Sequence, residues 1–362
     1  MILAQNHFQA VLLLVFGALC WALWAGIHKM TPNWRYELFC VDVAIGFAIA
    51  ISIYAFTVGS LGFDGFSFLD DLMHADKRQW LFAFSAGVVF NLANMILLGA
   101  VSVAGLSVAI PLGLGLSSTF GLGVSLLFSH ATNPFLVFAG SASFLVGVVL
   151  AAVTYSFLIS ARQERMVKEG KAKIAPHVPG LSKGMIVSTD APSATKGLLL
   201  SVVAAALMWI MYPLINKARN GESGLGPYAL MALFSLGLFG STFVFDLFLI
   251  NLPVEGEPIE PLEYIRGSLK THLLGVFAGI LLCSGILAEL VSAGSPPEAQ
   301  AGPLMTYGVK QLAPLIAGCA GVWIWKELKD AEGRVRAIFY AFAFLFAVGA
   351  ACFIAAASMP KA

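Results

Sequence analysis

Five ionisable side chains lie inside or at the edges of long apolar stretches: Glu37, Asp42, Asp246, Glu289 and Lys310. A charged group at the centre of a bilayer costs at least about 2.5–3.5 kcal/mol on insertion scales. Such residues therefore usually face an internal cavity and serve a function. A carboxylate there can take up or release a proton, and a lysine can pair with a carboxylate or with a charged end of a ligand.

Glu289 and Lys310 form the sharpest pairing, because they lie on consecutive apolar stretches joined by a short loop. An unpaired buried lysine tends to lose its proton, whereas an opposite charge within about 4–6 Å keeps both groups ionised. We expect the two side chains to face each other in a cavity, as a gate or as part of a binding site. The alternative is a purely structural ion pair.

Glu37 lies at the edge of the second apolar stretch, and Asp42 lies about a turn and a half deeper. Desolvation favours the neutral acid, so a change of exposure would move a proton on or off either group. Glu37 and Asp42 are therefore the candidate proton-coupling residues. The alternative for Glu37 is an end residue paired with Arg35, and Asp246 is expected to be a solvated end or a packing partner.

Amide and aromatic side chains at similar depth complete the candidate binding site. They are Trp21, Trp24, Asn91, Asn94, Trp209, Tyr212, Tyr307 and Gln311. Amides with aromatic faces suit a small, polar, hydrogen-bonding solute such as a sugar or a flat heterocycle. The alternative for the aromatic residues is anchoring at the membrane interface, which fits Trp323 and Trp325.

The elements that must position these residues are spanning helices, since 59% of the 362 residues are hydrophobic and only 11% are charged. A bilayer-spanning helix needs roughly 20 mostly apolar residues. The expected spans are 9–28, 37–58, 80–99, 103–128, 134–157, 197–216, 227–250, 272–293, 303–325 and 336–357. The fold class is therefore an all-α polytopic membrane protein with ten transmembrane helices. Glycine and proline interrupt the fourth and ninth spans.

The polar segment 158–196 divides the chain into halves of five spans, residues 1–157 and 197–362, and is expected to be a cytoplasmic linker loop. Trp21 in the first span and Lys29 directly after it match Trp209 in the sixth span and Lys217 directly after it at a constant offset. Five is an odd number, so the second half must enter the membrane upside down. Two inverted five-helix repeats are typical of secondary transporters. The alternative is coincidence between apolar segments of low complexity.

Fifteen of the 21 lysines and arginines lie on the side of the 158–196 loop and five on the opposite side. This bias places both termini outside and the loop in the cytoplasm. The net charge of +1 indicates no nucleic-acid partner. The five cysteines have no metal-ligand spacing, so we expect neither a metal nor a cofactor.

Several runs carry a resemblance to a known family. They are Asn33–Phe39 with Asp42 and Gly46, Gly87–Asn94, Ala104–Ala109, Tyr307, Gln311, Ala313–Leu315 and Trp325–Glu327. They resemble the ureide permease family and its bacterial relatives in the drug/metabolite transporter superfamily, which also holds glucose/ribose porters. The resemblance implies ten helices, a central cavity and proton-coupled uptake of a small polar solute. It also implies roles for Glu37, Asp42, Asn91, Asn94, Tyr307 and Gln311.

Two residues depart from the family pattern: Glu289 replaces an uncharged residue and Lys310 replaces a small one. Ureides, nucleobase-like compounds and sugars therefore all stay open as solutes. We expect a multi-pass secondary active transporter, working by alternating access in the plasma or inner membrane, and the sequence leaves a homodimer open. The alternatives are a passive channel or facilitator and, less favoured because no nucleophile–base pair is found, a membrane-embedded enzyme.

Overall fold

The computed structural model describes residues 1–128, 133–168, 173–174, 186–187, 194–329 and 331–359. Within them the chain is helical apart from two strands of two residues each, β1 (Lys173–Ile174) and β2 (Ile186–Val187), which pair antiparallel. Helices satisfy their backbone hydrogen bonds internally, as a bilayer requires.

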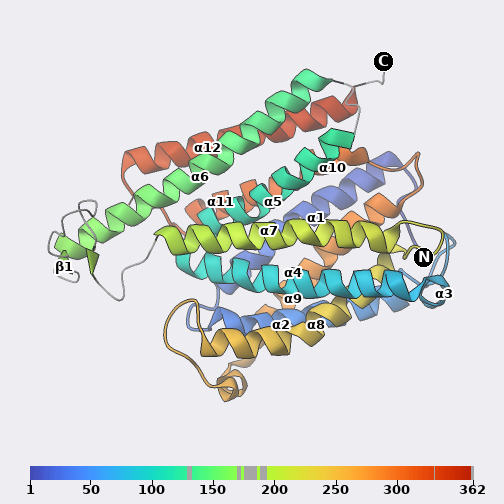
Figure 1. Ribbon diagram of the computed structural model, residues 1–362, viewed down its shortest axis with the longest axis horizontal. Coiled ribbons are helices and arrows are strands. Elements are labelled where there is room, and N and C mark those ends of the chain that lie inside the picture. The colour runs from blue at the N-terminus through green and yellow to red at the C-terminus, as the bar shows by residue number, and fades with distance from the viewer. Residues whose placement is uncertain (129–132, 169–172, 175–185, 188–193, 330, 360–362) are drawn as a thin grey trace.

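The helices bundle side by side with their long axes roughly aligned (Figure 1). The long ones are α1 (His7–His28), α2 (Tyr36–Phe56), α4 (Lys77–Ala104), α5 (Leu106–Phe128), α6 (Pro134–Lys168), α7 (Ala194–Arg219), α8 (Pro227–Asn251), α9 (Leu269–Gly294) and α12 (Gly333–Ser358). The shorter ones are α3 (Phe68–His74), the 3-10 helix η1 (Pro261–Arg266), α10 (Gly302–Lys310) and α11 (Leu312–Trp323). The start of α1 and the end of α12 lie at the same end of the bundle, on the right in Figure 1.

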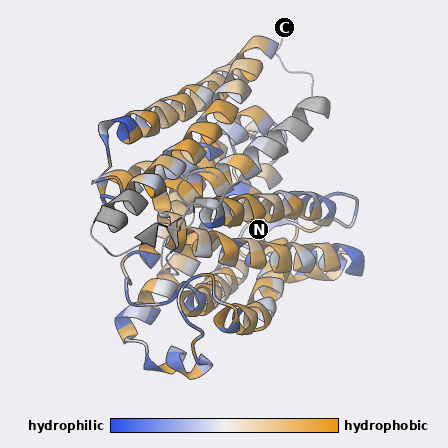
Figure 2. Cartoon of the chain, turned by 60° about the vertical axis from the view of Figure 1, so that its left-hand side comes forward, coloured by the Kyte–Doolittle hydropathy of each residue, from blue (hydrophilic) through white to orange (hydrophobic). Residues whose placement is uncertain are grey.

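Among the described residues, eight helices are long and apolar enough to cross a membrane: α1, α2, α4, α6, α7, α8, α9 and α12. Hydrophobic residues cover the middle of the helices, and hydrophilic residues gather at helix ends and loops (Figure 2). Large apolar side chains such as Phe135, Phe138 and Leu199 are exposed on the outside of the bundle. The chain is therefore a multi-pass, all-helical membrane protein.

The ninth expected span, 303–325, is not one continuous helix. It consists of α10 and α11, with Gln311 between them, and α11 ends at Trp323. Pro314 has no backbone N–H, so it cannot donate to the carbonyl of Lys310 four residues earlier. This missing hydrogen bond explains why the helix is interrupted here, next to the candidate site residues Lys310 and Gln311.

The expected boundary of the 158–196 linker also differs, because α6 continues to Lys168 and α7 begins at Ala194. The run 159–168 contains Arg, Gln, Glu, Met and Lys, which are strong helix formers, so the helix can extend beyond its apolar part. Segments 169–172, 175–185 and 188–193 of the expected linker lie outside the described residues.

Helices from the two halves of the chain alternate in the packing. α1 packs against α9 and α4 against α7; α2 packs against both α8 and α9, and α4 also packs against α8. α6 and α12 form a pair along one side of the bundle, with α5 and α11 between this pair and the other helices (Figure 1).

Two of these helix pairs approach through reciprocal glycines. A Cβ on Gly46 of α2 would lie 2.0 Å from the Val276 oxygen of α9, and one on Gly279 of α9 would lie 2.1 Å from the Val43 oxygen of α2. Gly87 of α4 meets α8, and Gly237 of α8 meets α4, equally closely. Small residues let backbones in a membrane approach this closely, and any side chain would force the helices apart.

Candidate functional site

A cavity of about 390 Å³ lies between α1, α5, α7, α9 and α10. Its lining includes Arg219 and Gln300 from helix ends and loops, and Trp21 and Ser118 from the middle of helices. The cavity therefore reaches from one end of the bundle into its centre. The exposed lining residues Asn216, Gln300 and Pro303 lie where α7 stops and α10 begins, so the cavity opens at this end. It is also the end at which α1 starts (Figure 1).

The polar group at the inner part of this cavity consists of Glu289, Lys310 and Tyr212. The Nζ of Lys310 lies 2.7 Å from Oε2 of Glu289 and donates to the hydroxyl of Tyr212 at 2.8 Å. The same ammonium is 4.5 Å from the centre of the Tyr212 ring. The predicted contact between Glu289 and Lys310 is thus present. Because the ninth span is interrupted, Lys310 lies at the C-terminus of α10, where the helix dipole favours a cation.

The other candidate aromatic residues divide into two sets. Trp21 and Tyr307 line the cavity, together with Tyr212. Trp24 is fully buried in the protein core and is not among the lining residues, and Trp209 lies on α7 with its side chain half-buried, also outside the lining. Trp21 and Trp24 have no hydrogen-bond partner for their indole N–H groups among the described residues. Trp21 lines the cavity with other atoms of its ring, because its indole nitrogen is itself buried.

Gln311 lies just behind the cavity wall. It is 1% exposed, and its Nε2 donates to the hydroxyl of Ser118 at 2.6 Å. Ser118 itself lines the cavity, so Gln311 can hold the orientation of a lining hydroxyl without touching the solute. The sequence did not single out Ser118, because isolated serines in glycine-rich helices are common packing residues.

Asn91 and Asn94 do not line the cavity. The side-chain amide of Asn91 donates to Ser241 at 2.9 Å and Thr242 at 3.1 Å, which ties α4 to α8. Asn94 is 2% exposed, and its Oδ1 has no hydrogen-bond partner among the described residues. The structure therefore gives Asn91 a helix-packing contact in a place where the sequence led us to expect a solute contact.

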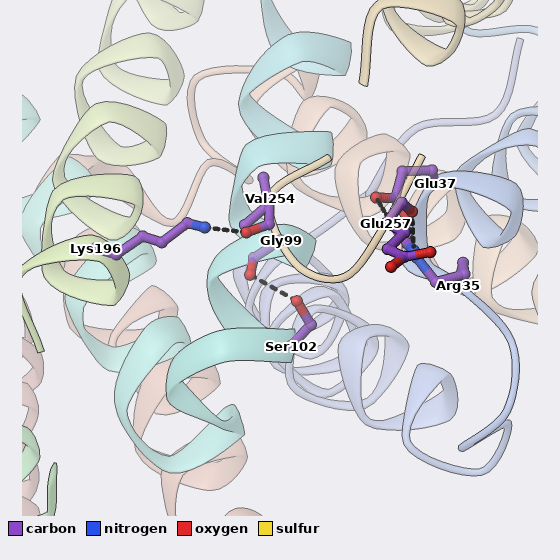
Figure 3. A network of polar contacts seen from close by, with 7 residues as sticks. All are labelled: Arg35, Glu37, Gly99, Ser102, Lys196, Val254 and Glu257. Carbon is purple, nitrogen blue, oxygen red and sulfur yellow. Dashed lines mark hydrogen bonds and ion pairs between the residues drawn. The ribbon is translucent and has the colours of Figure 1, made fainter. Parts of the chain in front are cut away.

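Glu37 is fully buried at the opposite end of the bundle and pairs with Arg35. Its two carboxylate oxygens accept from the guanidinium at 2.7 and 3.1 Å, the arrangement named above as its alternative interpretation. Arg35 also donates to the carbonyl of Glu257 at 3.0 Å (Figure 3). In the same view Lys196 at the start of α7 donates to the carbonyl of Val254, so two segments hold the loop after α8.

Asp42 is 1% exposed and lies away from the cavity, between α2, α9 and η1. Its Oδ1 accepts from the hydroxyl of Tyr264 at 2.6 Å and lies 2.8 Å from Nδ1 of His272. Burial and the hydrogen bond to this carboxylate raise the pKa of Tyr264. His272 and Tyr264 escaped the sequence analysis because His272 lies at the start of α9 and Tyr264 lies in the short 3-10 helix η1 before it. No cluster of three metal-ligating side chains is found in the described part of the chain.

Glu327 joins the start of α5 to the end of α1 at the end of the bundle opposite the cavity mouth. Its carboxylate accepts from the backbone N–H groups of Leu106 at 2.8 Å and Ser107 at 2.7 Å, and it pairs with Lys29 at the end of α1. Gly105 precedes them at φ +88°, and a Cβ there would lie 2.9 Å from the Glu327 carboxylate. Burial alone would raise the pKa of Glu327, but Lys29 and the Ser107 donors outweigh it and lower that pKa.

Comparison with known proteins gives one similarity along the whole chain. The sequence is 20% identical over 401 aligned residues to Ureide permease 1 of Arabidopsis thaliana, and the alignment covers all of both chains. No family model matches the sequence. Together with the apolar helices, this similarity supports a membrane transporter.

Proposed function

We propose that this protein is a secondary active transporter that carries a small polar solute by alternating access. The observation that carries the proposal is a cavity open at one end of the bundle, with Glu327 holding α1 and α5 together at the other end. A transporter must expose one site to either side in turn, and this combination is what one of its two states requires. The relative's name makes a ureide the first solute to test, with nucleobase-like compounds and sugars next.

Ten spans in two inverted repeats, residues 1–157 and 197–362 joined by a linker, are the architecture that we propose. Adding α5 and the α10–α11 pair to the eight long helices gives ten. The packing supports an inverted repeat, because an exchange of the halves turns the α1–α9 pair into α7–α4 and the α2–α9 pair into α8–α4. The reciprocal glycine crossings of α2 with α9 and of α8 with α4 are related in the same way.

The positive-inside bias gives the proposed orientation, with both termini outside the cell and the 158–196 segment in the cytoplasm. The cavity mouth then faces the outside, and Glu327 closes the cytoplasmic end. In this orientation the structure corresponds to a state ready to take up solute in the plasma or inner membrane. Opening inward would require Glu327 to release Lys29 and the first N–H groups of α5.

Protons are the coupling ion that we propose, with Asp42 or Glu37 as the proton site. Both carboxylates are buried, and Asp42 connects α2 with His272 of α9, the helix that also carries Glu289. Protonating Asp42 would weaken its contacts with His272 and Tyr264 and so loosen α2 from α9. Inward opening could then follow proton binding.

The test is uptake into proteoliposomes with an imposed pH gradient, using labelled ureides, nucleobases and sugars. Asp42→Asn should abolish gradient-driven accumulation while leaving solute exchange intact. Accumulation that survives in both Asp42→Asn and Glu37→Gln would contradict the assignment of the proton site. A saturable rate that ignores the gradient in the unmodified protein would point to a passive facilitator.

A further inference from the structure

The charges that line the cavity do not cancel. Among its described lining residues, one is a carboxylate, Glu289, and two are cations, Lys310 and Arg219. Glu289 and Lys310 pair with each other. Arg219 forms no ion pair with a described side chain, although it is half-buried at the last position of α7. The cavity therefore carries an excess positive charge that none of the described side chains pairs.

The position of Arg219 relative to the paired charges has a defined spacing. Tyr212, Asn216 and Arg219 lie on the cavity-lining face of α7. Tyr212 and Arg219 are seven residues apart, which is about 10 Å along the helix. A short solute can thus contact the guanidinium with one end and the Tyr212–Glu289–Lys310 group with the other.

The start of α10 adds to the same electrostatic field. Gly302 and Pro303 line the cavity mouth, and no side chain caps the first N–H groups of this helix. A helix N-terminus carries a partial positive charge. The C-terminus of α7 at the same mouth carries the opposite partial charge, so the full charge of Arg219 decides that the mouth favours an anion.

We infer that the transported solute is an anion: a small acid that carries a carboxylate for Arg219 at one end and amide-type N–H groups at the other. This deepens the proposed function, on which it rests, by naming the solute's charge. Arginine binds a carboxylate through two parallel hydrogen bonds, which an uncharged solute could not use. At the inner end, the ion pair uses Oε2 of Glu289, so Oε1 can accept from a solute N–H.

Two matched probes separate charge from shape. N-carbamoylglycine carries a carboxylate and a ureido group, and N-carbamoylglycinamide replaces the carboxylate with an amide of nearly the same size. Equilibrium binding of both labelled compounds to the purified protein, and their uptake into proteoliposomes at pH 7 on both sides, should favour the carboxylate. Losing one charge-assisted contact corresponds to roughly tenfold or more in affinity.

Arg219→Gln should weaken binding of the carboxylate about tenfold or more and leave the amide unchanged, and Arg219→Lys should restore part of the loss. Lys217→Gln is the matched control. It removes the same charge from the same end of α7, but Lys217 lies over the ring of Phe82 and outside the cavity lining. Lys217→Gln should therefore change neither affinity.

The outcomes separate this inference from the proposed function. Arg219-dependent binding of the carboxylate without uptake would overturn transport and keep the anion site. The anion site would be overturned if the two probes bound equally, or if neither bound. It would also be overturned if Arg219→Gln weakened binding of both probes equally, or if Lys217→Gln weakened binding as much as Arg219→Gln. Uptake of another, neutral solute would then leave the proposed function standing.

Discussion

The contact between Glu289 and Lys310 gives a prediction whose size can be worked out from the structure. Removing one partner of a fully buried ion pair costs about 3–5 kcal/mol, because it leaves the other charge uncompensated. Here the two side chains are 14–15% exposed and face an open cavity, so water can reach them. We therefore expect a loss below that range, about 2–3 kcal/mol in the free energy of unfolding, for Glu289→Gln.

Lys310→Met should cost less than Glu289→Gln. The carboxylate left behind in Lys310→Met can turn to water in the cavity, whereas the ammonium left in Glu289→Gln loses its charged partner and keeps neutral acceptors, the Gln side-chain oxygen and the Tyr212 hydroxyl at 2.8 Å. The double variant removes both charges and should be more stable than Glu289→Gln alone. The coupling energy between the two sites should be about 1–3 kcal/mol.

The assay is thermal or denaturant unfolding of the purified protein in one detergent, measured for all four members of the double-mutant cycle, followed by uptake in proteoliposomes. A double variant that is stable but transports nothing would place the pair in the solute site. Additive losses, with no coupling beyond about 0.5 kcal/mol, would refute the reasoning that each charge depends on the other.

Three further predictions concern the fold around the site. Glu327→Gln loses the ion pair with Lys29, so the end of the bundle opposite the cavity mouth should open more often. Labelling of a cysteine placed at the buried Ser107 should then rise several-fold relative to the exposed control Glu332→Gln, and unchanged labelling would exclude Glu327 as a gate. Gly87→Leu should prevent stable folding, because a Cβ there would lie 2.0 Å from the backbone oxygen of Phe234. Gly240→Leu should fold, because a Cβ at Gly240 would meet no atom within 4 Å. Equal stability of the two variants would contradict the close crossing of α4 and α8. Burial raises the pKa of Asp71 to about 6, although its contacts with the Gly226 N–H oppose this shift. The free energy of unfolding should therefore fall as pH rises from about 4 through 6, and Asp71→Asn should flatten that profile. A profile unchanged by the substitution would contradict the shift.

Much of the helical architecture is determined by the sequence alone. Long apolar stretches must form helices in a bilayer because no water is present to satisfy the backbone, and this holds whatever the neighbours are. The first span, expected at 9–28, is α1 at His7–His28, and the eighth, expected at 272–293, is α9 at Leu269–Gly294. The contact between Glu289 and Lys310 could also be predicted, because an unpaired buried charge is costly and a short loop limits the available partners.

Which polar residues share a cavity was decided only by the tertiary structure. Asn91 and Tyr307 looked equivalent in the sequence, yet Asn91 bonds to α8 while Tyr307 faces the cavity. The rotation of each helix about its axis makes this difference, and packing against neighbouring helices sets that rotation. Arg219 and His272 lie at helix ends, where the sequence predicts solvated groups; long-range packing turns the first into the cavity and the second onto Asp42.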